Sequence, residues 1–362
     1  MKIKNIFFAA ILVLAGFSCS MEDDAIMNDV EKGIEEATEA YTVLDFGVAF
    51  NEMATKASTT VVPGEDRPAT GDENNDEKKI SEVSVFLLED GKVIGILIPQ
   101  NRNQVSSNSD GSITLKDLKF VTKYKTNRTL DAHVVINGNQ FLKNINIGDA
   151  QSALNQQISG CLSADQLIKY GSTRIVFGKD ITNSYSSPSV AENNPTTILV
   201  KVSHVAARLD FSQFDVTLKG FEGNPTVVFD EAKFVNLQQN GKIVEGDASV
   251  NVKDGAFLNR SNRIGTRWTD MGTAYGYANQ YKQDSEKNTA LYVKFTVDGR
   301  TFEKTYPINP AGITKEVDHN GIKGGYLYDI KVRWTITPDW GDSTIEFYTR
   351  DWVHNSIPEI VL

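Results

Sequence analysis

The chain has 362 residues, of which 40% are hydrophobic, and it carries a formal net charge of −10 and two cysteines. This length and apolar content suffice for two ordinary domains with packed cores. The negative charge argues against a nucleic-acid partner, which needs a basic face, and two cysteines are too few for a cysteine-ligated zinc site.

The chain begins with the pattern of a secretory signal. Lys2 and Lys4 precede an unbroken apolar run at 6–15, and small residues lead to Cys19, with Phe17 as an exception. The run is shorter than the about 20 residues of a membrane-spanning helix, so residues 1–18 are predicted to be a signal peptide. Cys19 resembles the lipidation site of a bacterial lipoprotein; the alternative is a plain secreted protein. With Cys19 acylated, Cys161 is left alone and no intramolecular disulfide can form.

A tether, a strand and a loop are predicted next. Residues 19–40 are acidic and polar, which is typical of a solvated tether that is either a surface-export signal or a simple spacer. Over 41–50 the apolar residues alternate, which predicts a strand with one buried face. The residues of that face are Leu44, Phe46, Val48 and Phe50. The polar stretch 51–79 predicts a long exposed loop that is open to proteolysis.

Strands continue after this loop. Residues 83–88 and 93–98 flank the turn at Asp90-Gly91, which is typical of a β-hairpin. Two more strands are expected at 112–120 and 130–136. Apolar residues at helical spacing predict short helices over 149–159 and 163–170.

Residues 183–196 are rich in Ser, Asn and Pro, which favours a domain boundary between 195 and 196. A long strand is expected over 197–211, with a bulge or bend where the apolar phase slips between Val202 and Val205. Further strands are expected at 214–218, 226–237, 243–252, 289–297, 300–308, 325–336 and 343–362. Many short strands with Gly and Pro turns predict a mainly β protein of two tandem β-sandwich domains, 41–195 and 196–362, with the short helices in the first.

Sequence motifs give no sign of catalysis. No nucleophile elbow, zinc-protease motif, P-loop or dinucleotide fingerprint occurs, and the histidines lack the neighbours of a triad or a metal pair. These histidines are His133, His204, His319 and His354. We therefore expect no enzyme, no cofactor and no metal site.

Two weak binding patterns have simpler interpretations. Asp72, Asn74 and Asp76 alternate as in a calcium loop, but the glycine and closing Glu are misplaced, which favours an acidic loop. Tryptophans near the C-terminus would suit a carbohydrate-stacking platform, although alternation favours core positions. They are Trp334, Trp340 and Trp352.

The two ends of the mature chain are unusual. Removing the first strand, 41–50, would expose a hydrophobic groove and unpaired backbone groups. The last segment, 343–362, is strand-like and apolar, and such a segment can fill another subunit's groove by β-strand addition. A contact of this kind that does not close makes a filament. The apolar residues of this donor segment are Ile345, Phe347, Trp352, Ile357, Ile360 and Leu362.

With these features the chain resembles the fimbrillin family, the type V pilins of anaerobic Gram-negative bacteria. The resemblance covers nearly the whole mature chain. Each of its motifs is loosely defined, and the resemblance rests on the order in which all of them occur. They are the lipoprotein start, residues 43–50 with 55–58, 80–87 with 90–91, 199–209, 326–330 and 350–352. The resemblance implies sandwiches of the transthyretin-like, Greek-key type.

The resemblance also implies a mechanism of assembly. The lipoprotein precursor reaches the outer membrane, a trypsin-like protease cuts the loop after the first strand, and the C-terminal segment of one subunit enters the vacated groove of the next. The matching cut lies between Lys56 and Ala57. Family members usually carry Arg at this position, which leaves the protease open, and Arg67 precedes Pro68 and is a poor substrate.

Three functions follow as alternatives. A stalk or accessory shaft subunit of an extracellular fimbria is favoured, because both the removable strand and the donor segment are present. Its partners would be other copies or related subunits, the protease, and the outer membrane through the lipid, with an unidentified surface receptor. The alternatives are a monomeric outer-membrane lipoprotein that binds glycans and a fimbrial tip adhesin.

Overall fold

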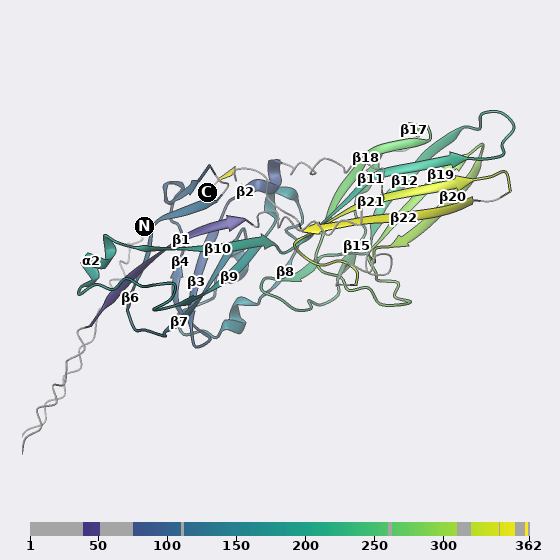
Figure 1. Cartoon of the computed structure of the whole chain (residues 1–362). Coiled ribbons are helices and arrows are strands. Elements are labelled where there is room, and N and C mark those ends of the chain that lie inside the picture. The colour runs from purple at the N-terminus through teal and green to yellow at the C-terminus, as the bar shows by residue number, and fades with distance from the viewer. Residues whose placement is uncertain are drawn as a thin grey trace, which may run out of the picture. The chain divides into compact units, whose positions relative to one another are not determined.

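The structure is a computed structural model that describes residues 39–50, 75–109, 112–259, 263–309, 320–339, 341–351 and 359–360 (Figure 1). The predictions for the signal peptide, Cys19, most of the tether, and the Lys56–Ala57 cut lie outside these residues. Trp340, Trp352, Ile357 and Leu362 also lie outside them.

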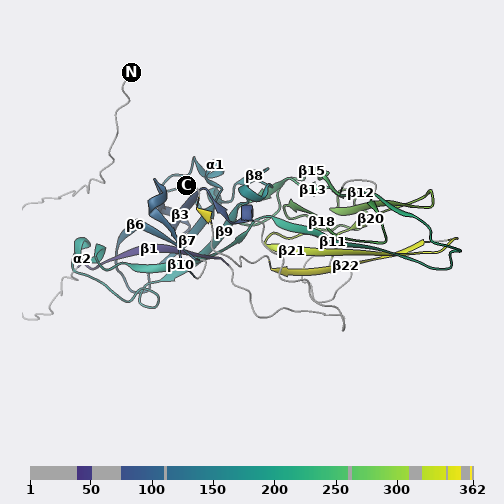
Figure 2. The same cartoon turned by 90° about the horizontal axis from the view of Figure 1, so that it is seen from above.

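An eight-stranded sheet, here called the N-terminal sheet, holds the first half of the described chain (Figures 1 and 2). Its strand order is β4-β3-β7-β9-β10-β1-β6-β5. In chain order the strands are β1 (Tyr41–Phe50), β3 (Val83–Glu89), β4 (Lys92–Leu97), β5 (Val105–Ser107), β6 (Ile113–Lys123), β7 (Thr129–Ile136), β9 (Lys169–Val176) and β10 (Thr196–His204).

The N-terminal sheet curls so that strands near its two edges face each other. A Cβ atom on Gly95 of β4 would lie 2.8 Å from the ring carbon Cε2 of Phe120 on β6, so a larger residue would require the Phe120 ring to shift. The curl encloses a buried cluster to which β1, β3, β6, β7 and β10 all contribute. This cluster includes Phe46, Val85, Leu115, Val134 and Val200.

Two further sheets form the C-terminal sandwich. One has the order β18-β11-β21-β22, and the other has the order β16-β12-β19-β20 with β17 paired to β12. The strands are β11 (Ala207–Leu218), β12 (Val227–Val235), β16 (Phe257–Asn259), β17 (Arg263–Ile264), β18 (Arg267–Gly276), β19 (Ala290–Val297), β20 (Arg300–Pro307), β21 (Tyr326–Ile336) and β22 (Gly341–Asp351).

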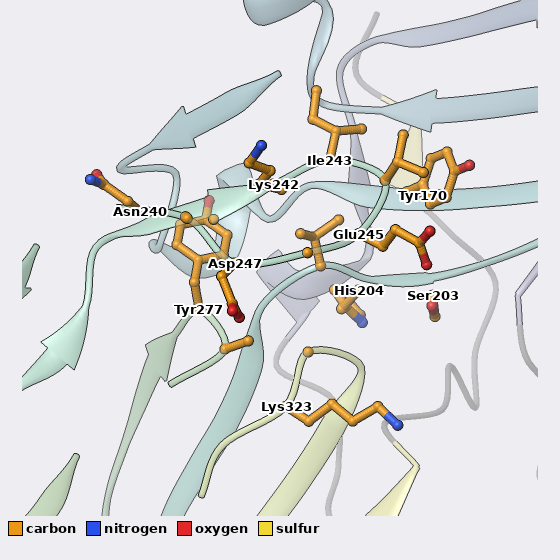
Figure 3. A pocket seen from close by; sticks show the side chains of 17 residues that line it. Tyr170, Ser203, His204, Asn240, Lys242, Ile243, Glu245, Asp247, Tyr277 and Lys323 are labelled. Carbon is orange, nitrogen blue, oxygen red and sulfur yellow. The ribbon is translucent and has the colours of Figure 1, made fainter. Parts of the chain in front are cut away.

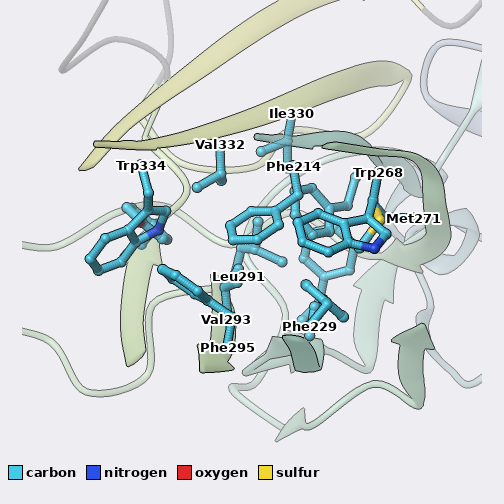
Figure 4. Packing of buried hydrophobic residues seen from close by; sticks show 14 of the residues in the cluster. Phe214, Phe229, Trp268, Met271, Leu291, Val293, Phe295, Ile330, Val332 and Trp334 are labelled. Carbon is cyan, nitrogen blue, oxygen red and sulfur yellow. The ribbon is translucent and has the colours of Figure 1, made fainter. Parts of the chain in front are cut away.

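Aromatic rings fill the space between the two sheets of the C-terminal sandwich (Figure 4). The Phe214 ring lies 5.3 Å from the Phe229 ring and 5.3 Å from the Phe295 ring, both edge-on. Trp334 packs edge-on against Phe295 at 5.0 Å between ring centroids. Edge-to-face pairs of this kind add about 0.5–1.5 kcal/mol each beyond their buried area.

Short elements complete the described chain. The paired strands are β2 (Lys79–Ile80) with β23 (Glu359–Ile360), β8 (Gln157–Ser159) with β14 (Asn240–Lys242), and β13 (Leu237–Gln238) with β15 (Val252–Lys253). The helices are α1 (Asn139–Leu142) and α2 (Pro188–Glu192), and the 3₁₀ turns are η1 (Asn75–Lys78), η2 (Arg102–Gln104), η3 (Gln151–Leu154) and η4 (Ala164–Gln166).

The mainly β fold with short helices is confirmed, as are most predicted strands and the hairpin at 83–98. Its turn residues Asp90 and Gly91 both have positive φ angles, 49° and 72°, as a tight type I′ hairpin turn requires. The helices expected at 149–159 and 163–170 are wrong. Those stretches contain η3, β8, η4 and the start of β9 instead, because Leu154, Ile158 and Leu167 pack into a core from η3, from β8 and from the residue after η4.

Two predicted strands are also corrected. The expected strand over 197–211 is two strands, β10 in the N-terminal sheet and β11 in the C-terminal sandwich. The slip in apolar phase marks the passage at Val205–Ala206 from one sheet to the other. Residues 243–252 are mostly turn and coil, and only Val252 lies in a strand.

The change of sheet therefore falls at 205–206, whereas the sequence places a domain boundary at 195. Strand β10 stays in the N-terminal sheet because it pairs with both β1 and β9. The division into two domains itself stays a prediction. A third buried cluster, which includes Phe86, Ile168, Ile243 and Tyr277, contains residues from both halves of the chain.

Candidate functional site

Strand β1 lies inside the N-terminal sheet, with a neighbour on each side (Figures 1 and 2). It runs parallel to β10 and antiparallel to β6. Phe46, for example, is opposite Ile198 on β10 and Leu115 on β6. The strand that begins the described chain thus fills a two-sided slot between strands that come later.

One face of β1 is fully buried, as its alternation predicts. Leu44, Phe46 and Val48 are 0% exposed and Phe50 is 6% exposed. Burying a side chain of this size contributes about 1.5–3 kcal/mol, so these four residues hold the strand firmly. The strand itself is confirmed, and its removal stays a prediction.

The other face of β1 is partly covered, which the alternation does not predict. Val43 on this face is wholly buried, and helix α2, which contains the buried residue Ala191, packs against β1. The hydroxyl of Ser187 caps α2 by accepting a hydrogen bond from the backbone N–H of Val190 at 3.4 Å. A short helix thereby shields the start of the strand.

Backbone bonds fasten the first residues of β1. Tyr41 and Tyr185 exchange two backbone hydrogen bonds of 2.8 Å, and the Tyr124 N–H donates to the Ala40 carbonyl at 2.7 Å. Glu39 and Lys123 form an exposed ion pair, and its hydrogen bond lowers the pKa of the Glu39 carboxyl. Exposed pairs of this kind contribute little to stability.

The predicted donor segment begins within β22, an edge strand of the C-terminal sandwich. β22 pairs with β21 along its whole length, with Ile345 opposite Val332 and Phe347 opposite Ile330. Further on, Ile360 in β23 pairs in parallel with Ile80 in β2. The chain end therefore returns to a strand that precedes the N-terminal hairpin.

Glu77 is a buried charged residue that the sequence does not predict, because the polar composition of 51–79 indicates an exposed loop throughout. Its side chain is 0% exposed in η1. Its carboxylate accepts hydrogen bonds from Arg208 Nη1, at 3.0 Å, and from the Tyr275 hydroxyl. Its backbone carbonyl accepts one from Lys169 Nζ at 3.0 Å. A run of acidic residues gave no signal that one of them has a buried basic partner far along the chain.

A cavity of about 280 Å³ lies where residues 240–248 meet the end of β10 (Figure 3). Its lining includes His204, Lys242 and Glu245. Among the described residues no group of three His, Cys, Asp or Glu side chains could hold a metal ion. The cavity presents charges of both signs, and this mixture selects no ligand class.

The two described histidines are buried structural residues. His133 is 3% exposed, its Nδ1 lies 2.7 Å from the Tyr170 hydroxyl, and burial lowers its pKa. His204 is 2% exposed. No helix in the described ranges is long and apolar enough to cross a membrane.

Trp334 is a core residue, as the alternation favours. It is 6% exposed and packs edge-on against Phe295 (Figure 4). Its ring also packs edge-on against Phe302. It therefore presents no face to a sugar. Of the three tryptophans considered for a stacking platform, it is the one that the structure describes.

Comparisons with known proteins place the chain by its fold. No family model and no curated protein sequence matches it. A crystal structure described as a "putative cell adhesion protein" from Parabacteroides distasonis superposes with a TM-score of 0.57 at 17% identity, covering 86% of this chain and 97% of that one. A second such protein from the same species gives 0.50 at 13% identity, covering 87% and 100%. A fimbrilin from Porphyromonas gingivalis gives 0.48 at 15% identity, covering 86% and 98%.

At these identities the likeness concerns the fold alone. It extends over nearly the whole length of each related chain, so the similarity covers the complete arrangement of sheets and is not limited to one sandwich. The mainly β fold that the resemblance implies is thereby confirmed: this chain shares the fold of the two Parabacteroides distasonis proteins described as putative cell adhesion proteins.

Proposed function

We propose that this protein is a structural subunit of a cell-surface fimbria and that the slot of β1 is its assembly site. The observation that carries the proposal is the position of β1 between β10 and β6. The fold shared with two proteins described as putative cell adhesion proteins supports a role at the cell surface.

In this proposal the precursor carries lipid on Cys19 and is exported to the outer membrane. A trypsin-like protease cuts between Lys56 and Ala57, in the loop that follows β1. The cut separates β1 from the rest of the subunit, which then holds β1 only by non-covalent contacts. The lipid and the tether leave with β1.

Loss of β1 would create a specific receptor for another strand. The slot offers backbone groups of β10 on one side and of β6 on the other. Its floor is the apolar cluster that includes Leu115, Ile198 and Val200. An occupant must therefore be extended, with apolar side chains at alternate positions.

The proposed occupant is segment 343–362 of the next subunit. It begins in an edge strand, β22, which has one described neighbour, β21, so its release leaves the other strands of the sandwich paired. Because donor and slot lie on different parts of the chain, each contact leaves a free slot and a free donor. Such a heterologous contact extends into a filament.

The identity of the first residue of the subunit in intact fimbriae tests this proposal. Mass spectrometry of purified fibres should find Ala57 at the N-terminus and no peptide from 41–50. Fibres that retain those residues would reject the strand exchange. An N-terminus elsewhere in 51–74 would reject only the Lys56 assignment.

The glycan-binding alternative gains no support from Trp334, which lies in the core. A monomeric lipoprotein would also keep β1 in place on the cell. Mass spectrometry of the protein on intact cells, where a monomeric lipoprotein would retain 41–50, therefore separates the two functions.

A further inference from the structure

Strand β1 carries a buried polar side chain, Thr42, opposite Thr122 of β6. Thr42 lies on the face of β1 that also carries Leu44 and Phe46, and it is 0% exposed. Its Oγ1 has no hydrogen-bond partner within the part of the chain that the structure describes. A buried hydroxyl without a partner has lost its bonds to water and has gained none in return.

A second irregularity of β1 lies at Asp45, three residues after Thr42. The pairing of β1 with β6 jumps from Leu44 opposite Phe120 to Phe46 opposite Leu115, so residues 116–119 bulge out opposite Asp45. Asp117 in this bulge has a φ of 57°, in the left-handed region. The Oδ1 atom of Asp45 is buried and also lacks a hydrogen-bond partner among the described residues.

The second half of β1 has neither irregularity. Phe46, Val48 and Phe50 are buried apolar residues, and the register with β10 continues unbroken from Leu44 to Phe50. The unmet polar atoms are therefore concentrated between Thr42 and Asp45.

We propose that Thr42 and Asp45 make β1 a weakened occupant of its own slot, so that an incoming strand with an apolar side chain at the Thr42 position displaces it. This inference rests on the proposed function and identifies the feature of β1 that makes its replacement by the incoming strand favourable. Two strands in one slot make equivalent backbone hydrogen bonds, so their side chains decide which one binds more tightly.

The position of Thr42 defines what the slot selects. Valine has nearly the shape of threonine without the hydroxyl, so an apolar residue fits there and leaves no polar group unpaired. The expected partner is therefore a strand of a second subunit that has an apolar residue at the position that Thr42 occupies in β1. A strand with a polar residue at that point would compete no better than β1.

Hydrogen exchange of the uncut full-length chain tests the weakening directly. In Thr42→Val the amides of β1 should exchange about tenfold more slowly than in the wild type, which corresponds to about 1.4 kcal/mol. Thr42→Ser retains the hydroxyl and should not slow the exchange. Thr305→Val makes the same change at an exposed site on β20 and should leave β1 unaffected.

Protease-triggered assembly then tests the consequence. Thr42→Val should be cut at the wild-type rate and should polymerise several-fold more slowly. Unchanged exchange in Thr42→Val would overturn the inference, as would polymerisation at the wild-type rate despite slower exchange. A wild-type chain that is cut and never polymerises would reject the proposed function instead, and the exchange data would still decide whether Thr42 weakens β1.

Discussion

The carboxylate of Glu77 accepts a hydrogen bond from Nη1 of Arg208 at 3.0 Å, and the two residues are 131 positions apart in the chain. Glu77 belongs to η1, directly before β2, and Arg208 belongs to β11 of the C-terminal sandwich. The Tyr275 hydroxyl donates to the same carboxylate, and Lys169 of the N-terminal sheet binds the Glu77 carbonyl. Glu77 therefore connects strands of both sheet systems.

Glu77→Gln should destabilise the protein by about 3–5 kcal/mol, because it leaves the guanidinium of Arg208 buried without one of its two carboxylate partners. Urea unfolding at neutral pH measures this loss. Glu222→Gln, which makes the same change at an exposed residue, is the matched control and should shift stability by less than about 0.5 kcal/mol. Equal effects in the two variants would contradict a structural role for Glu77.

His133 should make the protein less stable in acid. Burial holds the pKa of His133 below its ordinary value of 6.5, so the folded state binds fewer protons than the unfolded state. The stability contributed by neutral His133 is complete above pH 6.5, and it is lost as the pH falls through the folded-state pKa.

The free energy of unfolding of the wild type and of His133→Gln, measured between pH 7.5 and about 5, checks this prediction. The glutamine keeps a hydrogen-bonding group for the Tyr170 hydroxyl and removes the titration. The wild type should lose more stability than the variant over this range. Parallel curves would show that His133 does not contribute.

Phe46→Ala should destabilise the uncut chain and leave the stability of assembled fibres unchanged. In the uncut chain it should cost about 3–5 kcal/mol, because Phe46 is wholly buried. In fibres it should cost nothing, because β1 is absent from the assembled subunit of the proposed mechanism. Urea unfolding of the precursor and thermal dissociation of fibres measure the two effects.

Phe229→Ala is the control for this experiment, since its ring lies in the core of the C-terminal sandwich and stays there throughout. It should weaken both the precursor and the subunit within the fibre. Fibres weakened equally by both substitutions would show that β1 remains in place.

A mixture of two variants, one without the donor segment and one whose slot stays filled by β1, should form dimers in place of polymers. Deletion of 343–362 removes the donor and leaves the slot, and Lys56→Gln leaves the donor and keeps β1 attached. Neither variant should polymerise alone. After protease treatment, their mixture should form one-to-one dimers that size-exclusion chromatography with light scattering can detect.

Circular dichroism of the deletion variant provides the control for folding. It should retain the β spectrum, because β21 keeps β11 as its other neighbour when β22 is lost. Filaments formed by the deletion variant would refute the role of the C-terminal segment.

Local patterns in the sequence were sufficient to predict the strands in which apolar and polar residues alternate clearly. The strand Tyr41–Phe50 and the hairpin around Asp90-Gly91 were predicted correctly, because period-two burial and a left-handed turn are properties of neighbouring residues. The mainly β character of the whole chain follows in the same way. The helices at 149–159 and 163–170 failed because helical spacing in short apolar stretches does not distinguish a helix from turns that bury single residues.

Only the tertiary structure decided which elements meet. The place of β1 between β10 and β6, the passage between sheets at 205–206, and the burial of Glu77 against Arg208 all depend on residues far apart in the chain. The sequence likewise could not show that the Thr42 hydroxyl is buried without a hydrogen-bond partner, because both properties depend on the residues that the fold places around it. The sequence alone thus determined that the first strand is amphipathic. The fold decided that this strand fills a slot and carries unpaired polar groups there, because pairing and burial arise from long-range contacts that local periodicity does not encode.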